Sequence, residues 1–449
     1  MKKLANRLQQ LLLVSLGLAA SLGAQAKSID FEAKLATPVV QAGRAQTAFL
    51  KVALTGFELQ AQGDRPLANV AIVIDKSGSM SGERIERAKE AATMAINTLL
   101  SNDIVSIVAF DNTVEVVTPA TKVSDKARIA QSIRSIRANG GTGLFAGVSK
   151  GAFEVRKFLD KNRVNRVILL SDGQANVGPS SPAELGQLGA MLARQGISVT
   201  TIGLGSDYNE DLMTQLAAFS DGNHAFVENS RDLVRIFERE FGDVGSVVAQ
   251  EVEVTIRLKM GIRPVRILGR EGEITDGVVR LRMNQLYSQQ EKYVVLEVEV
   301  PARKAGQSMA LADVDVSYLN MLSKATERMN RVVNVSFSDS EQAVAKATDT
   351  KAMVSAVQQV ANETSKDALR LRDAGKLEEA KKLMQDNTTY LKEQSVILGG
   401  QAAPAPALQQ MEANSKAQAE TIDSQDSAQW NLSRKALKAD QYKLDKQQK

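Results

Sequence analysis

The chain has 449 residues, of which 43% are hydrophobic and 24% charged, with a formal net charge of +4, as expected of a globular protein with more than one domain. It has no cysteine and one histidine, His224, which excludes disulfides, thiolate metal sites, cysteine nucleophiles and multi-histidine zinc centres. Aromatic residues make up 4% of the chain, too few to supply stacking platforms for nucleic acid.

Residues 1–26 predict a signal peptide. Three basic residues precede an apolar stretch from Leu11 to Ala20, and Ala24-Gln25-Ala26 forms a small-x-small cleavage site. The apolar stretch is shorter than the ~20 residues that a membrane-spanning helix needs. We therefore expect cleavage near Ala26, a periplasmic or secreted location in a bacterium, and no transmembrane segment in the mature chain.

The next segments predict part of one β-structure and a complete α/β domain. Residues 28–40 and 47–59 indicate two strands, which are too few to fold alone, so we assign 27–66 to a β-sandwich that later strands complete. Residues 67–246 alternate apolar strands with helices. This alternation predicts a doubly wound, mostly parallel sheet of the Rossmann-like kind, inserted within the sandwich.

Beyond residue 246 the pattern changes twice. Residues 247–338 alternate apolar and polar side chains with a period of two, which predicts the remainder of an antiparallel β-sandwich. Residues 339–399 show helical spacing with a break at Gly375, typical of an α-helical hairpin. The Ala-, Gln- and Pro-rich composition of 400–449 predicts a flexible linker and a polar tail.

Oxygen-bearing side chains lie in three loops at the predicted carboxyl edge of the sheet. Two of these loops directly follow a strand, and one directly precedes a helix. Asp75, Ser77 and Ser79 lie in DKSGSM, Thr142 lies in GGTGL, and Asp172 lies in LSDG. Ligands of open α/β sheets bind at the carboxyl edge of the strands, so the fold would bring these side chains together. Oxygen-only coordination with two carboxylates suits Mg²⁺, with Mn²⁺ or Ca²⁺ as alternatives.

Each motif also has a simpler structural explanation. The two serines and Thr142 could cap the helices that follow them, and Asp172-Gly173 is a common turn dipeptide. The joint occurrence of all three motifs on one edge of the sheet favours the metal site. His224, without a second histidine, is interpreted as a strand residue.

These three motifs resemble the DxSxS, Thr and Asp elements of the metal-ion-dependent adhesion site (MIDAS) of a von Willebrand factor A domain. The resemblance covers about residues 67–246, and the flanking strands and helices are similar to secreted bacterial relatives of inter-alpha-trypsin inhibitor heavy chains. It implies that Asp75, Ser77, Ser79, Thr142 and Asp172 hold a divalent cation that binds an exposed Asp or Glu of another protein in cell adhesion or a similar interaction.

An enzymatic alternative is a metal-dependent, phosphatase-like hydrolase. DKSGSM also resembles the DxDGT loop of haloacid-dehalogenase-type phosphatases, in which an aspartate attacks phosphorus and a second carboxylate acts as general acid. Asp75 would be the nucleophile here, but Ser77 occupies the position of the acid. We therefore expect a binding protein and not an enzyme.

Overall fold

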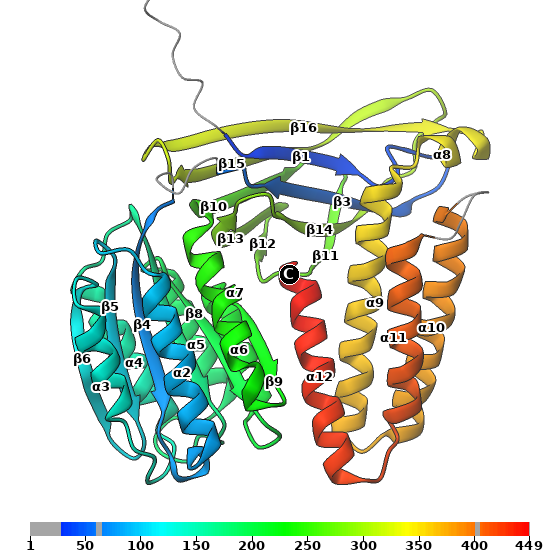
Figure 1. Cartoon of the computed structure of the whole chain (residues 1–449). Helices are drawn as coiled ribbons and strands as arrows, with labels where there is room; N and C mark the ends of the chain where they lie inside the picture. The colour runs from blue at the N-terminus through cyan, green and yellow to red at the C-terminus, as the bar shows by residue number, and fades with distance from the viewer. Residues whose placement is uncertain (1–27, 60–64, 400–404, 449) are drawn as a thin grey trace, which may run out of the picture.

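The computed structural model describes residues 28–59, 65–399 and 405–448. These residues form three units, an α/β domain, a β-sandwich and a helical unit, that lie side by side in Figure 1. The predicted signal peptide lies outside the described residues. None of the helices in the described ranges is long and apolar enough to cross a membrane.

The α/β domain is built on a sheet of six strands, in which only β6 runs antiparallel to its neighbour. In spatial order the strands are β6 (Val114–Lys122), β5 (Ile104–Phe110), β4 (Leu67–Asp75), β7 (Arg163–Ser171), β8 (Ile197–Leu204) and β9 (His224–Val227). The helices are η2 (Gly78–Met80), α2 (Glu83–Thr98), α3 (Lys126–Arg134), α4 (Leu144–Arg156), α5 (Pro182–Ala193), α6 (Glu210–Ser220), η3 (Ser230–Asp232) and α7 (Leu233–Gly245). The predicted α/β fold class is confirmed.

Helices cover both faces of this sheet, which explains the continuously apolar strands. In β4, Ile72 and Ile74 pack with α2, α3 and α7, whereas Ala71 and Val73 pack with α4, α5 and α6 on the other face. All four side chains are fully buried. A strand covered on both sides has no solvent-facing position, so its sequence does not alternate.

The β-sandwich consists of two antiparallel sheets that enclose one apolar core. The first sheet has the order β1 (Asp30–Leu35), β3 (Gln46–Thr55), β14 (Glu291–Val300) and β11 (Arg263–Leu268). The second has the order β12 (Glu273–Thr275), β13 (Val278–Tyr287), β10 (Val247–Leu258), β15 (Ser308–Asn320), β16 (Thr326–Ser338) and β2 (Val39–Gln41), with β2 parallel to β16.

The α/β domain is inserted between strands of this sandwich. Strand β3 pairs with β14 along its whole length, from Gln46 opposite Val300 to Thr55 opposite Glu291. The amino end of β7 lies against β10, because Gln250 Nε2 donates to the carbonyl oxygen of Arg163 at 3.0 Å. The carboxyl ends of the parallel strands therefore point away from the sandwich (Figure 1).

The helical unit is larger than the predicted hairpin. It comprises α8 (Glu341–Ala347), α9 (Thr350–Asp373), α10 (Leu377–Gly399), α11 (Pro406–Thr421) and α12 (Ser427–Lys446). The prediction of a flexible linker and polar tail for 400–449 is thus wrong for residues 405–448. Alanine, glutamine and lysine are strong helix formers, and widely spaced apolar residues such as Leu408, Ile422 and Leu437 are enough to bury one face.

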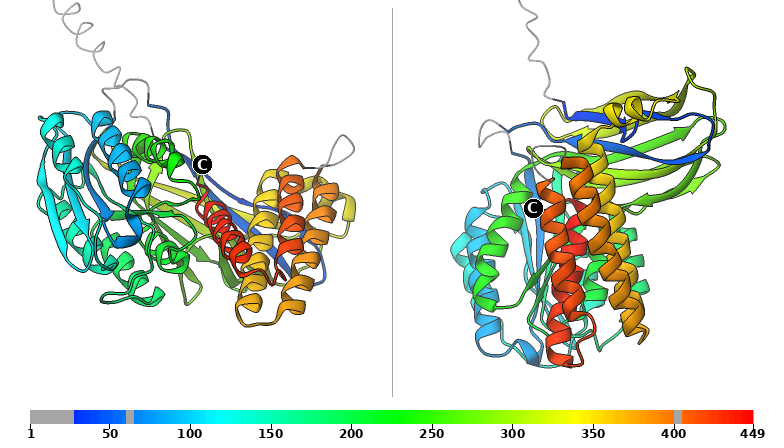
Figure 2. Two further views of the ribbon diagram at one scale, coloured as in Figure 1. Left: turned by 60° about the horizontal axis from the view of Figure 1, so that its bottom comes forward. Right: turned by 90° about the vertical axis from the view of Figure 1, so that its right-hand side faces the viewer.

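The last helix, α12, joins the helical unit to the α/β domain. It lies between the two in the left view of Figure 2, and it packs against α6, α9 and β9. Lys435 Nζ contacts Glu210 Oε2 at 2.8 Å, and Arg434 Nη2 contacts Asp211 Oδ2 at 2.9 Å. The hydroxyl of Tyr442 donates to the carbonyl of Gly222 at 2.7 Å. The two acidic side chains at the amino end of α6 are therefore paired with basic side chains of α12.

Strand β3 should be required for the later strands to fold. A fragment of residues 247–338 lacks both β1 and β3, so β14 is left with an open edge, which promotes edge-to-edge association. We expect it to aggregate, as measured by size-exclusion chromatography. The same fragment fused behind residues 28–59 through a flexible linker should be soluble. A monomeric, folded 247–338 fragment would contradict the interdependence of the two segments.

His224 should make the protein less stable in mild acid. Its ring is fully buried and packs edge-on to Tyr442. Its Nδ1 shares a hydrogen bond of 2.9 Å with Thr201 Oγ1, with the direction set by the tautomer. Burial, with a smaller contribution from Lys443, lowers the pKa of His224 to about 3. The unfolded chain binds a proton below about pH 6.5 and the folded chain does not, so stability falls as the pH falls through that value.

From about pH 7 to about pH 5 this group alone should remove about 2 kcal/mol from the free energy of unfolding. Urea titrations at both pH values measure the change. His224→Gln should lose that part of the pH dependence, whatever its own stability at neutral pH. Identical pH slopes for the two proteins would mean that His224 is protonated in the folded state.

Candidate metal centre

The candidate metal centre lies at the carboxyl end of β4, the strand at the centre of the sheet. Asp75 is the last residue of β4, and Asp172 follows the last residue of the adjacent strand β7. Both side chains are fully buried. The loop that carries Thr142 is fastened to the loop after β4, because the N–H of Gly78 donates to the carbonyl of Gly140 at 2.9 Å.

The structure brings all five predicted side chains together. Ser77 Oγ and Ser79 Oγ are 3.0 Å apart, and the Ser79 hydroxyl donates to Asp172 Oδ1 at 2.8 Å. A Cβ atom placed on Gly173 would lie 2.8 Å from Thr142 Oγ1 and 3.6 Å from Asp75 Oδ2. Two carboxylates and three hydroxyls from three loops thus surround one point on the edge of the sheet.

The simpler explanations of these residues as helix caps and a turn do not describe what the side chains do. Ser77 precedes η2, but its hydroxyl makes no capping hydrogen bond. Gly143, not Thr142, is the residue that caps α4, and it has no side chain to do so. Asp172 is held by Ser79 and by Arg84 instead of facing solvent in a turn.

The spacing of the oxygens is that of ordinary hydrogen bonds and also allows octahedral coordination. Mg²⁺ takes ligands at 2.0–2.1 Å, so that neighbouring oxygens of its octahedron are about 3.0 Å apart. The distances from Ser79 Oγ to Ser77 Oγ and to Asp172 Oδ1 are 3.0 and 2.8 Å. Among the described residues no three carboxylate or imidazole groups converge on a metal position. The hydroxyls must therefore complete any ligand set, and the residues present fit a hard divalent cation.

The electrostatics of the site also call for a cation. Burial raises the pKa of Asp75 to about 6, and the charge of Asp172 adds to this, although hydrogen bonds from Ser171 and Ser77 oppose it. Within the part of the chain that the structure describes, no basic side chain comes within 4 Å of Asp75. A buried carboxylate without a cationic partner is unstable in its charged form. A divalent ion at this point would supply the missing charge.

Two neighbours of the site were missed by sequence reasoning. Ser171 donates its hydroxyl to Asp75 Oδ2 at 2.5 Å, and Arg84 Nη1 donates to Asp172 Oδ2 at 2.5 Å. Arg84 lies in the first turn of α2, where the helix dipole disfavours a positive charge. That unfavourable placement was a signal in the sequence that Arg84 has an acidic partner beyond its own helix.

Other features noted in the sequence do not belong to this site. His224 lies in β9 and contacts Thr201, Tyr208 and Tyr442, as expected of a structural strand residue.

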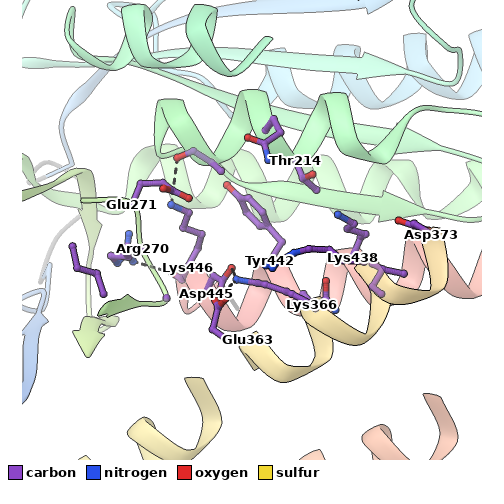
Figure 3. Close-up of a pocket in the computed structure, with 17 residues that line it drawn as sticks. Thr214, Arg270, Glu271, Glu363, Lys366, Asp373, Lys438, Tyr442, Asp445 and Lys446 are labelled. Atoms are coloured by element: carbon purple, nitrogen blue, oxygen red, sulfur yellow. Dashed lines mark hydrogen bonds and ion pairs between the residues drawn. The ribbon is translucent and has the colours of Figure 1, made fainter. Parts of the chain in front are cut away.

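The cleft of about 430 Å³ in Figure 3 lies between α6, α9, α12 and the segment after β11. Its charged side chains are largely paired with one another or with neighbours, as in Lys366 with Asp445 and Arg270 with Asp221.

An open, mostly parallel sheet with oxygen ligands at its carboxyl edge and helices on both faces defines a class of α/β binding domains. Residues 69–239 match the family model of the von Willebrand factor type A domain. The chain therefore contains a von Willebrand factor type A domain, which here covers the inserted α/β domain. Domains of this family generally mediate interactions and not catalysis, commonly with a metal ion at the MIDAS.

Two relatives extend the similarity in sequence. An uncharacterized protein of Synechocystis sp. is 27% identical over 260 residues, which cover 56% of this chain and 61% of that protein. Inter-alpha-trypsin inhibitor heavy chain H2 of Sus scrofa is 23% identical over 193 residues, 41% of this chain and 21% of its own length. The matched region thus spans less than two thirds of these relatives.

Two solved structures have the same fold. A von Willebrand factor type A protein from Catenulispora acidiphila aligns with a TM-score of 0.68 and 17% identity, covering 84% of this chain and 89% of that one. The ArnB paralog VWA2 from Sulfolobus acidocaldarius aligns with a TM-score of 0.63 and 17% identity, covering 94% and 99% of the two chains. The likeness therefore extends beyond the α/β domain to most of the chain.

Ser171 should support metal binding through Asp75. Ser171→Ala removes the hydroxyl that holds Asp75 Oδ2, and loss of such a supporting hydrogen bond typically weakens metal affinity about 10–100-fold. Isothermal titration with MgCl₂ and MnCl₂ measures the effect. Ser198→Ala is the matched control, because Ser198 is an equally buried strand serine whose hydroxyl has no hydrogen-bond partner in the described part of the chain. Equal affinities of the two variants would mean that Ser171 does not orient a ligand.

Proposed function

We propose that this chain is an exported bacterial binding protein that holds Mg²⁺ at Asp75, Ser77, Ser79, Thr142 and Asp172 and binds an exposed Asp or Glu of a partner protein through that ion. The observation that carries the proposal is the meeting of two fully buried carboxylates with three hydroxyl oxygens at one edge of the sheet. Mn²⁺ or Ca²⁺ could occupy the same ligands.

The position of the site supports binding of a large partner. Beside the buried ligands, Gly78, Ser79, Gly140 and Asn176 are exposed to solvent. The sandwich lies at the opposite end of the strands, so it leaves this edge uncovered. A carboxylate carried on the surface of another protein could therefore approach the ion without a change in the fold.

The ligand chemistry supports an acidic group as the recognised feature. With only two carboxylates, the protein cancels the charge of a divalent ion without exceeding it, and the hydroxyl ligands are neutral. Arg84, which contacts Asp172, adds a further positive charge at the rim of the site. The bound ion would keep its attraction for an incoming anion, which a cage of four or five carboxylates would lose.

The hydrolase alternative has less support from the arrangement of these groups. An acid catalyst is required near the nucleophile, and position 77 holds a serine. Asp172 is the other carboxylate at the site, and both of its oxygens already accept hydrogen bonds, Oδ1 from Ser79 and Oδ2 from Arg84. Hydrolysis of a phosphate monoester that is lost in Asp75→Asn would establish the alternative.

Export is proposed on the signal-peptide pattern of residues 1–26. An exported chain would lie in the periplasm or outside the cell, where it would meet proteins of the cell surface. Intact mass of the exported protein should correspond to a chain that begins at Lys27.

Partner binding should depend on a divalent ion and on Asp75. A pulldown with the chain as bait, in MgCl₂ and in EDTA, should recover a partner only with the metal, and Asp75→Ala should lose that partner. Asp386→Ala is the matched control, since Asp386 is an exposed aspartate on α10 that forms no ion pair with the residues the structure describes. Far-ultraviolet circular dichroism should show that Asp75→Ala remains folded. Partner recovery that persists in EDTA and in Asp75→Ala would refute the proposal.

A further inference from the structure

A groove in the helical unit has features of a second binding site, far from the metal centre. It lies between α11 and α12, with α9 and α10 as its floor and Tyr293 of β14 at one end, and its volume is about 460 Å³. Figure 2 shows these helices running along one another beside the sandwich. The floor is buried, as for Asn362 on α9 and Asn387 on α10, whereas Gln410 and Asn414 on α11 are exposed.

The lining is dominated by carboxamides. Six of them come from three helices: Gln358, Asn362, Gln410, Asn414, Gln418 and Gln441. Only Asp440 and Lys443 carry a charge among the lining residues. The cleft in Figure 3 is the opposite case, since it is lined mainly by charged side chains. A carboxamide both donates and accepts hydrogen bonds. The amide nitrogens of Asn362, Gln410 and Gln441 already donate within the helical unit, so the groove offers a neutral ligand the remaining donors and acceptors of its carboxamides.

One buried acceptor on the floor of this groove has no partner. Asn387 is 3% exposed, and its Nδ2 donates to the carbonyl of Ala361 at 3.0 Å. Its Oδ1 is buried and accepts no hydrogen bond among the described residues. Buried polar groups are normally satisfied, and Asn387 lines the groove. The oxygen atom itself is covered, so a ligand N–H in the groove would reach it only after a rotation of the Asn387 side chain.

The spacing of the carboxamides along α11 matches an extended polypeptide. Gln410, Asn414 and Gln418 are four residues apart, which places successive side chains about 6 Å apart along the helix axis. Every second residue of an extended chain repeats at about 6.6 Å and presents its N–H and C=O groups to the same side. Gln358 and Asn362 on α9 have the same four-residue spacing on the floor.

We infer that this groove binds an extended, uncharged peptide segment of a partner protein by hydrogen bonds to its main chain. Neutral oligosaccharides have the same mixture of donors and acceptors, but they require an aromatic platform for stacking. The one aromatic residue in the lining, Tyr293, is 7% exposed and already packs against the ammonium group of Lys51. The groove is independent of the metal centre, so its occupancy should not depend on a divalent ion.

Selection from a display library of short, unconstrained peptides tests this inference. The full chain is the target, and EDTA in every buffer keeps the metal centre from contributing. Selected peptides are then synthesised with a fluorophore, and their affinities are measured by fluorescence anisotropy. Gln410→Leu and Asn414→Leu should each weaken binding by roughly three- to tenfold, the effect of one hydrogen bond between neutral groups. Both residues are exposed, so both variants should fold.

Gln409→Leu is the matched control. Gln409 is the neighbouring, equally exposed glutamine of α11 and does not line the groove, so this variant should bind as the wild type does. Methylation of main-chain nitrogens in the peptide should abolish binding, because recognition is through main-chain N–H groups.

Three results would overturn the inference. The first is a selection that yields no peptide sensitive to Gln410→Leu, which would mean that water alone fills the groove. The second is full binding by N-methylated peptides. The third is binding of a neutral oligosaccharide such as chitotetraose that Gln410→Leu weakens while no peptide binds.

Discussion

A buried carboxylate at the end of the central strand is the constraint on which the functional edge of this protein depends. Asp75 continues the run of buried residues in β4, and its side chain is fully enclosed without a basic partner within 4 Å among the described residues. Such a group is tolerated only where the surroundings compensate for lost hydration. The loops after β4 and β7 and before α4 bend toward it, and each brings a hydroxyl or carboxyl oxygen.

The metal site could be predicted from sequence because it depends on a simple geometric rule. Parallel strands end on the same edge, so residues directly after them meet whatever the loops do in detail. Asp75 and Asp172 are fixed in this way by the pairing of β4 with β7. Arg84 was not predicted, because its contact with Asp172 depends on the direction of a helix side chain across a loop, which no strand pattern determines. Ser171 ends β7 beside the end of β4, so its contact with Asp75 follows from the same strand pairing, although its residue type did not mark it as part of the site.

The tail of the chain shows the limit of composition as a guide. Residues 405–448 contain few large apolar side chains, and a polar, alanine-rich segment is typical both of a linker and of a helix that packs on one narrow face. The tertiary contacts decide between the two, among them Leu408 and Ile422 in the core of the helical unit and Tyr442 against the α/β domain. The residues that make these contacts are far apart in the sequence, so a local sequence pattern could not reveal the contacts.

The discontinuous sandwich and the final helix also order the events of biosynthesis. Strand β3 leaves the ribosome well before β14, and the whole von Willebrand factor type A domain is made between them. That domain can form while β3 waits for its neighbour, since domains generally fold as units in the order of synthesis. The face of the domain at Tyr208 and His224 is covered only after α12 has been made. A nascent chain that stops short of α12 thus displays an uncovered face of the domain, and cellular quality control could recognise incomplete products by it.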